Sequence, residues 1–207
     1  NLIIKNKKKP VTCIIGGSKV STKINVILNL LKSANNLVIV GAMANNFIKF
    51  KGFNIGASLM EKGAEKIIKD IYDSAKKNKC NIIIPTDCMV SSDLNGDANH
   101  KKLGEITSKD IILDIGARTV ELINQTIENS KTVFWNGPAG YFENKNFANG
   151  TLSIAKKISE NTKSGSLISI VGGGDTISAI ENRDFKNVFT HLSTAGGAFL
   201  ESLEGKE

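Results

Sequence analysis

The stretch Val171-Gly172-Gly173-Gly174-Asp175-Thr176 carries the most information about the fold of this chain. Residues 166–171 are typical of a buried strand, and residues 175–180 of the first turns of a helix. Glycine tolerates positive φ and has no Cβ, so a polyanion could approach the bare amides where the helix begins. The alternative is that Asp175 simply caps the helix after a tight turn.

Asp175 follows the glycines directly, where its charge would repel a bound phosphate unless a cation lay between them. Mg²⁺ is usually held by one or two carboxylates together with substrate phosphates, which fits this arrangement. The macrodipole of a helix start also favours bound negative charge. Asp175 is therefore a candidate Mg²⁺ ligand.

Strand-like and helix-like segments alternate along almost the whole chain. Short apolar runs typical of strands occupy residues 11–15, 37–40, 81–84, 132–135, 167–171 and 187–190. Helical spacing of apolar residues occurs at 20–31, 43–50, 64–75, 117–128, 149–159 and 175–180, with a last helix expected from Gly197. The polar stretch 91–110 is expected to be a loop or a small hairpin, and the apolar run 111–115 leads into the next helix. Continuous apolar strands are typical of a parallel sheet that is covered on both faces. The pattern therefore predicts an α/β fold, with one doubly wound, mostly parallel sheet and helices on both of its faces. Such a fold is a Rossmann-like three-layer domain.

Four turns share the order strand, glycine, helix. They are Gly16-Gly17-Ser18-Lys19, Asn136-Gly137-Pro138-Ala139-Gly140, Gly172–Thr176 and Ser193-Thr194-Ala195-Gly196-Gly197. In open α/β sheets the ligand binds beyond the carboxyl ends of the strands, which is where all four turns would lie. One such turn is weak evidence, but four at one edge predict a phosphate cradle.

Three charged residues sit next to these turns. Lys19 and Lys23 are four residues apart at the expected start of a helix, where they would share one face and repel each other. A bound polyphosphate would turn that repulsion into attraction. Glu143 follows the second turn and could accept hydrogen bonds from ribose hydroxyls. The alternatives are two ordinary surface lysines and a solvent-exposed glutamate.

Composition excludes some classes of protein. The 207 residues are 41% apolar, which is enough for a sizeable core, and no run approaches the ~20 apolar residues of a membrane span. No secretory apolar segment opens the sequence, so we expect a cytoplasmic protein that binds no membrane. The net charge of +7 comes mostly from scattered lysines, which we interpret as solvated helix faces and not as a nucleic-acid site. The first residue is not Met, which suggests a piece of a longer chain.

Three familiar nucleotide-binding patterns do not occur in the sequence. It contains no Gly-x-x-x-x-Gly-Lys-Ser/Thr, and no Gly-x-Gly-x-x-Gly follows a strand. The His-Arg-Asp and Asp-Phe-Gly motifs of protein kinases are also missing. The sequence therefore supports neither a P-loop NTPase, nor a Rossmann dehydrogenase, nor a protein kinase.

Together the segments resemble the C-terminal, nucleotide-binding domain of the phosphoglycerate kinase family. The matching stretches are Gly16-Gly17-Ser18-Lys19-Val20-Ser21-Thr22-Lys23, Gly41-Ala42-Met43-Ala44-Asn45, Asp114-Ile115-Gly116, Phe134-Trp135-Asn136-Gly137-Pro138-Ala139-Gly140-Tyr141-Phe142-Glu143, Gly172–Thr176 and 193–205. They occur in the family's order over nearly the whole chain, and the Trp-Asn-Gly-Pro run is close to diagnostic.

The resemblance implies reversible phosphoryl transfer between 1,3-bisphosphoglycerate and Mg-ADP, giving 3-phosphoglycerate and Mg-ATP in glycolysis. It implies residues 1–10 as a residual interdomain segment and residues 11–207 as the nucleotide-binding domain of a two-domain kinase. The family's N-terminal domain, which binds phosphoglycerate, is missing here, so we expect a monomer that holds Mg²⁺ and ADP or ATP but needs that domain for turnover. The alternatives are a nucleotide-binding module without catalysis and, less well supported, a basic protein that binds nucleic acid.

The resemblance also implies a role for each matching residue. Lys19 would stabilise the transferring phosphoryl group, Lys23 would hold the nucleotide phosphates, and Asp175 would ligate Mg²⁺. The rest of the implied site consists of Gly173, Gly174 and Thr176 as donors to phosphate, Gly41 and Gly116 under adenine, Asn136 in the nucleotide pocket, Glu143 at the ribose, and Gly196 and Gly197 facing the acyl phosphate. The chain departs from the family's usual glycines at Val40, Ala42 and Ala195, and it has Thr22 where Asp is frequent.

Overall fold

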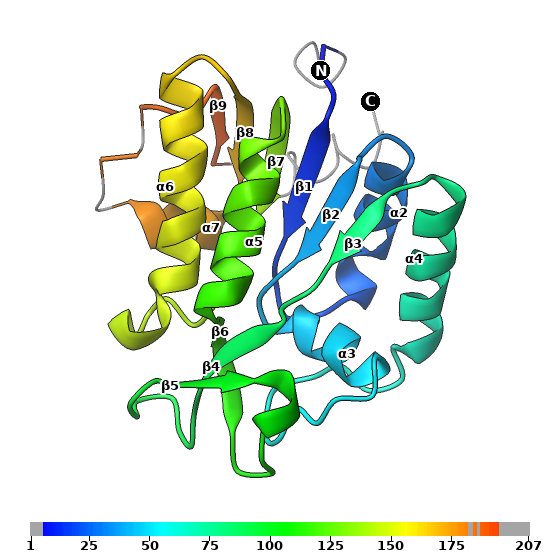
Figure 1. The fold of residues 1–207 in the computed structure, drawn as a ribbon, viewed down its shortest axis with the longest axis vertical. Coiled ribbons are helices and arrows are strands. Elements are labelled where there is room, and N and C mark those ends of the chain that lie inside the picture. The colour runs from blue at the N-terminus through cyan, green and yellow to red at the C-terminus, as the bar shows by residue number, and fades with distance from the viewer. Residues whose placement is uncertain (1–5, 182–183, 186, 195–207) are drawn as a thin grey trace.

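The computed structural model describes residues 6–181, 184, 185 and 187–194. Its main sheet has six parallel strands in the order β3-β2-β1-β7-β8-β9 (Figure 1). Their bounds are Asn81–Ile83, Asn36–Ile39, Val11–Ile15, Thr132–Asn136, Ile168–Gly172 and His191–Ser193, in that order. The chain builds the sheet outward from β1, first towards β3 and then, from β7, towards β9. The point where the direction reverses therefore lies between β1 and β7.

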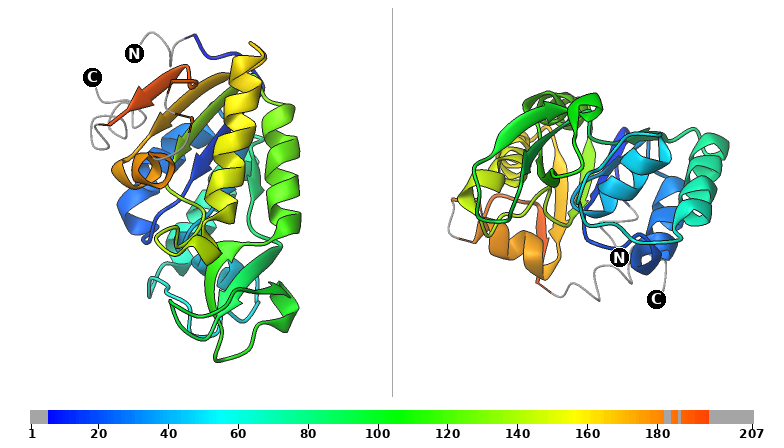
Figure 2. Two further views of the ribbon diagram at one scale, coloured as in Figure 1. Left: turned by 90° about the vertical axis from the view of Figure 1, so that its left-hand side faces the viewer. Right: turned by 90° about the horizontal axis from the view of Figure 1, so that it is seen from below.

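Helices cover both faces of this sheet (Figure 2). The helices are α2 (Ile24–Leu31), α3 (Met43–Phe50), α4 (Glu65–Lys77), α5 (Ala117–Glu128), α6 (Asn149–Lys163) and α7 (Gly174–Ile180). Because side chains of a strand alternate between faces, β1 contributes Val11, Cys13 and Ile15 to one core cluster and Ile14 to the other. The first cluster packs against α2, α3 and α4, and the second against α5 and α6. The predicted three-layer α/β architecture is confirmed.

A second, three-stranded antiparallel sheet lies beyond the carboxyl ends of the main strands, at the lower end of Figure 1. Its order is β5-β4-β6, with bounds Asn99–Lys102, Asp87–Ser91 and Ile111–Ile115. The sequence pattern predicts only one sheet, with a loop or small hairpin at 91–110. The polar β5 has no apolar periodicity, because its side chains are mostly exposed and it is held to β4 by backbone pairing and by the contact of His100 with Asp87.

Most of the other predicted elements are found within one to four residues of the expected bounds. The last strand is different, because it begins at His191 and not at residue 187. At Thr190 the side chains of Ser169 and Thr190 replace the backbone ladder: Ser169 N donates to Thr190 Oγ and Thr190 N to Ser169 Oγ, both at 3.0 Å. The helix expected from Gly197 lies outside the described residues.

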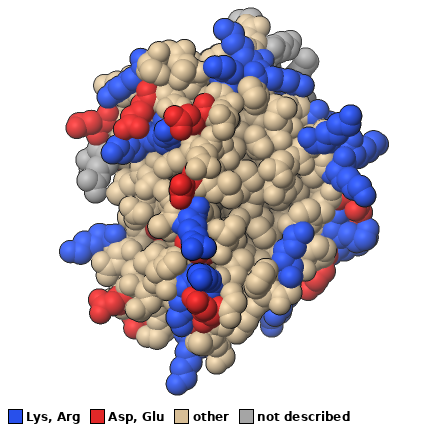
Figure 3. Space-filling view, viewed as in Figure 1, with Lys and Arg blue, Asp and Glu red and all other residues tan. Residues whose placement is uncertain are grey.

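The surface carries its lysines in a dispersed pattern. Figure 3 shows Lys and Arg scattered over one face, with Asp and Glu among them. On α4, Lys66 pairs with Asp70 at 3.3 Å and Lys69 with Asp73 at 2.7 Å, so these lysines belong to a solvated helix face. Within the described part of the chain, no helix combines the length and apolar character needed to cross a membrane.

Candidate nucleotide-binding site

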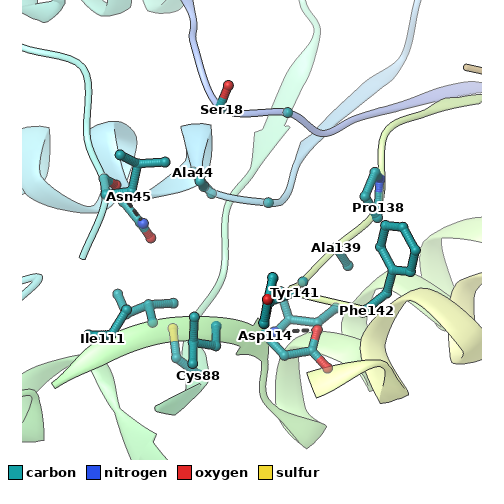
Figure 4. A pocket seen from close by; sticks show the side chains of 18 of the residues that line it. Ser18, Ala44, Asn45, Cys88, Ile111, Asp114, Pro138, Ala139, Tyr141 and Phe142 are labelled. Atoms are coloured by element: carbon teal, nitrogen blue, oxygen red, sulfur yellow. Dashed lines mark hydrogen bonds between the residues drawn. The ribbon is translucent and has the colours of Figure 1, made fainter. Parts of the chain in front are cut away.

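A cavity of about 380 Å³ lies between the carboxyl edge of the main sheet and the second sheet (Figure 4). Such a volume is within the usual range for a small-molecule site. The wall is formed by the turn after β1 (Gly17, Ser18), the start of α3 (Gly41, Ala42, Ala44, Asn45), strand β6 (111–115), the segment after β7 (138–143), and Leu59, Pro85, Cys88, Leu94 and Asp175. Most of these residues are apolar, and charged groups stand at only a few places.

The ends of four main strands are in register, which brings the glycine turns to one edge. Ile15 pairs with Asn136, Asn136 with Gly172, and Gly172 with Ser193. Three of the four predicted turns therefore lie side by side as expected. The fourth is described only at Ser193 and Thr194, while its remaining residues, Ala195, Gly196 and the predicted catalytic Gly197, lie outside the described residues.

The turns after β1 and β7 approach each other closely at the point where the strand order reverses. Gly16 N donates to Asn136 O at 2.8 Å. A Cβ on Gly137, whose φ is 104°, would lie 2.5 Å from backbone atoms of Gly16, and a Cβ on Gly16 would lie 2.5 Å from Pro138 O. Glycine is required at both positions because no side chain fits between the two backbones.

Lys23 is a half-buried cation beside this edge. Its Nζ donates to the carbonyl of Gly16 and, at 3.1 Å, to Oδ1 of Asn136. Burial lowers the pKa of Lys23 to about 8, and the opposing effect of the Asp175 carboxylate recovers only part of the shift. A phosphate at this position would compensate the buried charge.

Lys19 has a different environment. The helix does not begin until Ile24, after a 3₁₀ turn at Ser21–Lys23, so the two lysines do not share a helix face as predicted. Lys19 is exposed in the turn after β1, and its charge helps to lower the pKa of Glu61, after the larger effect of the Ser21 hydroxyl. The structure thus brings Lys23 to the strand ends and leaves Lys19 at the surface beside them.

The turn after β8 presents one carboxylate to the cavity. Asp175 is exposed and lines the wall, and Gly174 next to it is exposed as well. The first amides of a helix have no partner within the helix, so those of Gly174 to Thr176 are available at the start of α7. The hydroxyl of Thr176 is already engaged, because it accepts a hydrogen bond from Gly137 N at 2.7 Å in a fully buried position. The side chain of Thr176 therefore ties the turns together, and only its amide could face a ligand.

Asn136 stands beneath the cavity wall and is buried. Its Oδ1 accepts from Lys23, while its Nδ2 is buried without a partner among the described residues. A Cβ on Gly173, whose φ is 99°, would lie 2.8 Å from that Nδ2, so the amide packs directly against the β8 turn. Asn136 thus connects Lys23 to the turn after β8 without itself lining the cavity.

The remaining predicted residues are divided between the wall and its support. Gly41 and Glu143 line the cavity, and Glu143 is exposed. Gly116 is not part of the wall. It packs instead against the carboxylate of Asp87, which a Cβ at this position would overlap. Gly116 therefore serves close packing between α5 and β4 in this structure.

Sequence reasoning missed the wall formed by the second sheet. Ile111, Ile112 and Leu113 of β6 line the cavity, and so does Asp114, which is 2% exposed. Burial raises the pKa of Asp114 to about 7, although the amides of Gly150 and Ile115 donate to it. Two signals were present in the sequence: the matching stretch Asp114-Ile115-Gly116 and the apolar run before it, which periodicity alone cannot assign to a cavity wall.

Comparisons with known proteins show which family the chain is similar to. The family model for Phosphoglycerate kinase matches residues 1–206. A phosphoglycerate kinase of Wolbachia sp. subsp. Drosophila simulans is 44% identical over 205 residues, covering 97% of this chain and 51% of the relative. One from Bartonella tribocorum is 42% identical over 203 residues, with coverages of 97% and 51%.

Two solved structures have the same fold. The phosphoglycerate kinase from Coxiella burnetii superposes with a TM-score of 0.92 at 37% identity, covering 98% of this chain and 52% of that one. The enzyme from Pyrococcus horikoshii superposes with a TM-score of 0.77 at 30% identity, with coverages of 99% and 51%. The chain thus spans about half the length of the relatives it matches.

Proposed function

The chain belongs to the phosphoglycerate kinase family, and on that premise we propose that it is the nucleotide-binding half of an enzyme that transfers a phosphoryl group between 1,3-bisphosphoglycerate and Mg-ADP. The products are 3-phosphoglycerate and Mg-ATP. In the forward direction a terminal phosphate oxygen of ADP attacks the phosphorus of the acyl phosphate, and the carboxylate of 3-phosphoglycerate leaves. We propose a cytoplasmic location and a monomeric state as well.

The observation that carries this proposal is a largely apolar cavity whose wall includes the carboxylates of Glu143 and Asp175. Gly41, Ala42 and Leu113 offer surfaces on which a nucleobase can pack, and Glu143 offers a carboxylate at the rim for ribose hydroxyls. Asp175 and the start of α7 lie at the other end, next to the half-buried Lys23. A nucleoside diphosphate combines an apolar base, a polar sugar and an anionic tail in the same order.

The donors at Asp175 fit a bound Mg²⁺. Mg²⁺ keeps much of its water shell and is commonly held by one or two carboxylates and by phosphate oxygens, so a single exposed Asp beside a phosphate site supplies what it needs. When bound, the ion would neutralise charge on the phosphates during transfer.

The chain's own residues would contribute positioning and charge rather than acid–base chemistry, which matches the demands of phosphoryl transfer. Lys23, held by Gly16 and Asn136, would stay fixed against the nucleotide phosphates. Gly173, Gly174 and Thr176 would present amides to phosphate oxygens, and the exposed Lys19 would reach the phosphoryl group in transit. We propose that Gly41 floors the base site, with Gly116 and Asn136 supporting its walls, and that Gly197 faces the acyl phosphate.

Turnover would also require a surface that binds phosphoglycerate. We propose that this surface belongs to the other half of the family's fold, so that the 207-residue chain binds nucleotide without completing the reaction. A nucleotide-binding module without catalysis would bind in the same way. The two differ in whether adding the N-terminal half of a family member restores phosphoglycerate-dependent ATP formation.

The test is a calorimetric titration of the 207-residue chain with ADP, with and without Mg²⁺. We expect one site per chain and tighter binding when Mg²⁺ is present. A chain that is folded by circular dichroism but binds neither form would overturn the proposal. Binding to oligonucleotides that weakens steeply with salt, without binding to ADP, would instead favour a nucleic-acid partner.

A further inference from the structure

Two hydrogen bonds tie the connection between β4 and β5, residues 92–98, to the segment that leads into α6. The side-chain amide of Asn144 donates from Nδ2 to Leu94 O at 2.9 Å, and that of Asn146 donates to Gly96 O at 3.4 Å. The partners in each pair are 50 residues apart in the sequence. Because the connection belongs to the second sheet and the segment follows β7 of the main sheet, the bonds join the two sheets (Figure 1).

The shorter of these bonds lies at the rim of the cavity. Leu94 lines the cavity and is 45% exposed. Glu143, which also lines the cavity and is exposed, directly precedes Asn144 in the chain. The bond between Asn144 and Leu94 therefore joins two parts of the wall, one from each sheet, on a side of the cavity that is open to solvent.

Both partners of this bond are held in place by local contacts of their own. Oδ1 of Asn144 accepts from Asn146 N at 2.9 Å, at the start of a short 3₁₀ turn. With its oxygen engaged in this way, the amide has its NH₂ group left to donate to Leu94 O. On the other side, Asp93 Oδ1 accepts from Asn95 N at 2.8 Å and so keeps the connection in a tight turn.

Other hydrogen bonds already hold strand β6 to the segment after β7. Tyr141 N donates to Leu113 O at 2.7 Å, and Gly150 N donates to Oδ2 of Asp114 at 2.8 Å. These bonds keep β6 in the cavity wall without any contribution from Asn144. The connection between β4 and β5 begins where the pairing of β4 with β6 ends. Its place against the opposite wall therefore depends on the bond from Asn144.

We propose that Asn144 is a positioning residue for nucleotide binding: its bond holds Leu94 at the open side of the cavity, over the sugar and base of a bound nucleotide. This inference rests on the proposed function, which places a nucleotide between Asp175 and Glu143. Apolar surface is kept from water only while its cover stays in place, so a looser connection weakens binding of the sugar and base. A phosphate group held at Asp175, on the turn after β8, depends less on this bond.

The experiment compares Asn144→Ser with its matched control, Asn54→Ser. A serine hydroxyl can still accept from the amide two residues further on, but it is too short to reach the distant carbonyl. Asn54 is bonded in the same manner, since its Oδ1 accepts from Gly56 N at 2.9 Å and its Nδ2 donates to Ile106 O at 3.0 Å, 52 residues away. Asn54 does not line the cavity. The two variants should therefore lose similar stability, and only Asn144→Ser should change nucleotide binding.

Two measurements separate positioning from a purely structural role. In the ligand-free chain, hydrogen exchange across residues 92–98 should become faster in Asn144→Ser and stay at the wild-type rate in Asn54→Ser. Calorimetry should show that Asn144→Ser binds Mg-ADP about fivefold more weakly than wild type, a factor that one lost hydrogen bond can account for. Mg-pyrophosphate, which has neither sugar nor base, should bind to both variants within about twofold of wild type.

Three results would overturn the inference. They are unchanged exchange across residues 92–98 in Asn144→Ser, equal weakening of Mg-ADP and Mg-pyrophosphate in that variant, and equal weakening of Mg-ADP in Asn54→Ser. A folded wild-type chain that binds no ADP would instead overturn the proposed function. The exchange measurement needs no nucleotide, so it would still decide whether Asn144 holds the connection in place.

Discussion

His100 Nε2 lies 2.6 Å from Oδ2 of Asp87, a carboxylate with no exposed surface. The same carboxylate accepts from the amide and hydroxyl of Thr119, at 2.8 and 2.6 Å, and from the amide of Arg118 at 3.1 Å. One side chain therefore joins β4, β5 and the first turn of α5. Burial alone would raise the pKa of Asp87, but the hydrogen bonds from Thr119 and His100 outweigh it and lower that pKa.

We expect Asp87→Asn to destabilise the chain strongly, by about 3 kcal/mol, since it turns an acceptor-only group into one whose NH₂ faces buried donors. Urea unfolding followed by circular dichroism measures this loss. The matched control is Asp73→Asn on α4, where an exposed pair with Lys69 should change stability by less than about 0.5 kcal/mol. Equal losses in the two variants would show that Asp87 does not join the second sheet to α5.

Asp114 predicts a pH dependence of stability. Its pKa in the folded chain is raised from 3.8 to about 7, mainly by burial. Between these values the folded chain holds a proton that the unfolded chain has released, so the free energy of unfolding must fall as pH rises, by about 1.4 kcal/mol per pH unit from this group. Denaturant melts between pH 5 and pH 7 should show the decline, and Asp114→Asn should remove its share.

Asp110→Asn provides the comparison for that experiment. Asp110 accepts from Lys101 at 2.7 Å and from the amide of Thr107 at 2.7 Å, and these bonds lower its pKa against the opposing effect of burial. It stays ionised across the same pH range, so its variant should lose stability by a similar amount at every pH. The slope for Asp110→Asn should therefore equal that of wild type, and a wild-type slope in Asp114→Asn would rule Asp114 out.

Because the pKa of Lys23 is lowered, we expect the chain to take up protons when it binds a nucleotide in mildly alkaline solution. Burial lowers its pKa to about 8, so at pH 8.5 roughly three quarters of the free chain carries a neutral lysine. A bound polyphosphate favours the charged form and raises this pKa again. Calorimetry of ADP binding in two buffers of different ionisation enthalpy should therefore show an uptake approaching three quarters of a proton.

The test of this proton uptake is the variant Lys23→Met, and its matched control is Lys19→Met. Lys19 is exposed, so its replacement should weaken ADP binding without changing the number of protons taken up. Lys23→Met should weaken binding further and abolish the uptake. Uptake that persists in Lys23→Met would mean that another group carries the proton and that Lys23 does not meet the phosphates.

The residues that could be predicted from the sequence are those whose environment is local. The Gly172–Thr176 turn follows an apolar strand and precedes a helix, and both neighbours show in the periodicity. Parallel strands ending in register then bring Gly16, Asn136 and Gly172 together, as the topology of a doubly wound sheet requires. The meeting of these three glycine turns at one edge of the sheet therefore followed from pattern and chain connectivity.

The far wall of the cavity could not be predicted in this way. Strand β5 is polar and exposed, and the sequence gives no sign that Ile111 to Leu113 turn towards the glycine edge. Asn45 and Leu59 are 14 residues apart and meet only because α3 and the following loop fold against each other. The position of the Asn45 amide in the cavity wall depends on that tertiary contact, which no spacing in the sequence encodes.

Asp175 gives a last prediction, which separates a metal ligand from a helix cap. An exposed carboxylate beside the cavity would attract Mg-ADP through the ion and repel metal-free ADP directly. Asp175→Asn should therefore weaken the binding of Mg-ADP by at least about tenfold, and leave the binding of metal-free ADP unchanged or slightly tighter. Calorimetry with Mg²⁺ or with a chelator measures the two dissociation constants.

Glu143→Gln is the matched control, because its carboxylate lines the same cavity but lies on the segment after β7 and not on the turn after β8. This variant should weaken the binding of Mg-ADP and of metal-free ADP by the same factor, since a ribose contact does not depend on the metal. If Asp175→Asn also weakened both forms equally, its carboxylate would act on the turn and not on Mg²⁺. A loss of thermal stability with unchanged binding would leave Asp175 as a helix cap alone, because capping contributes to folding whether or not a nucleotide is bound.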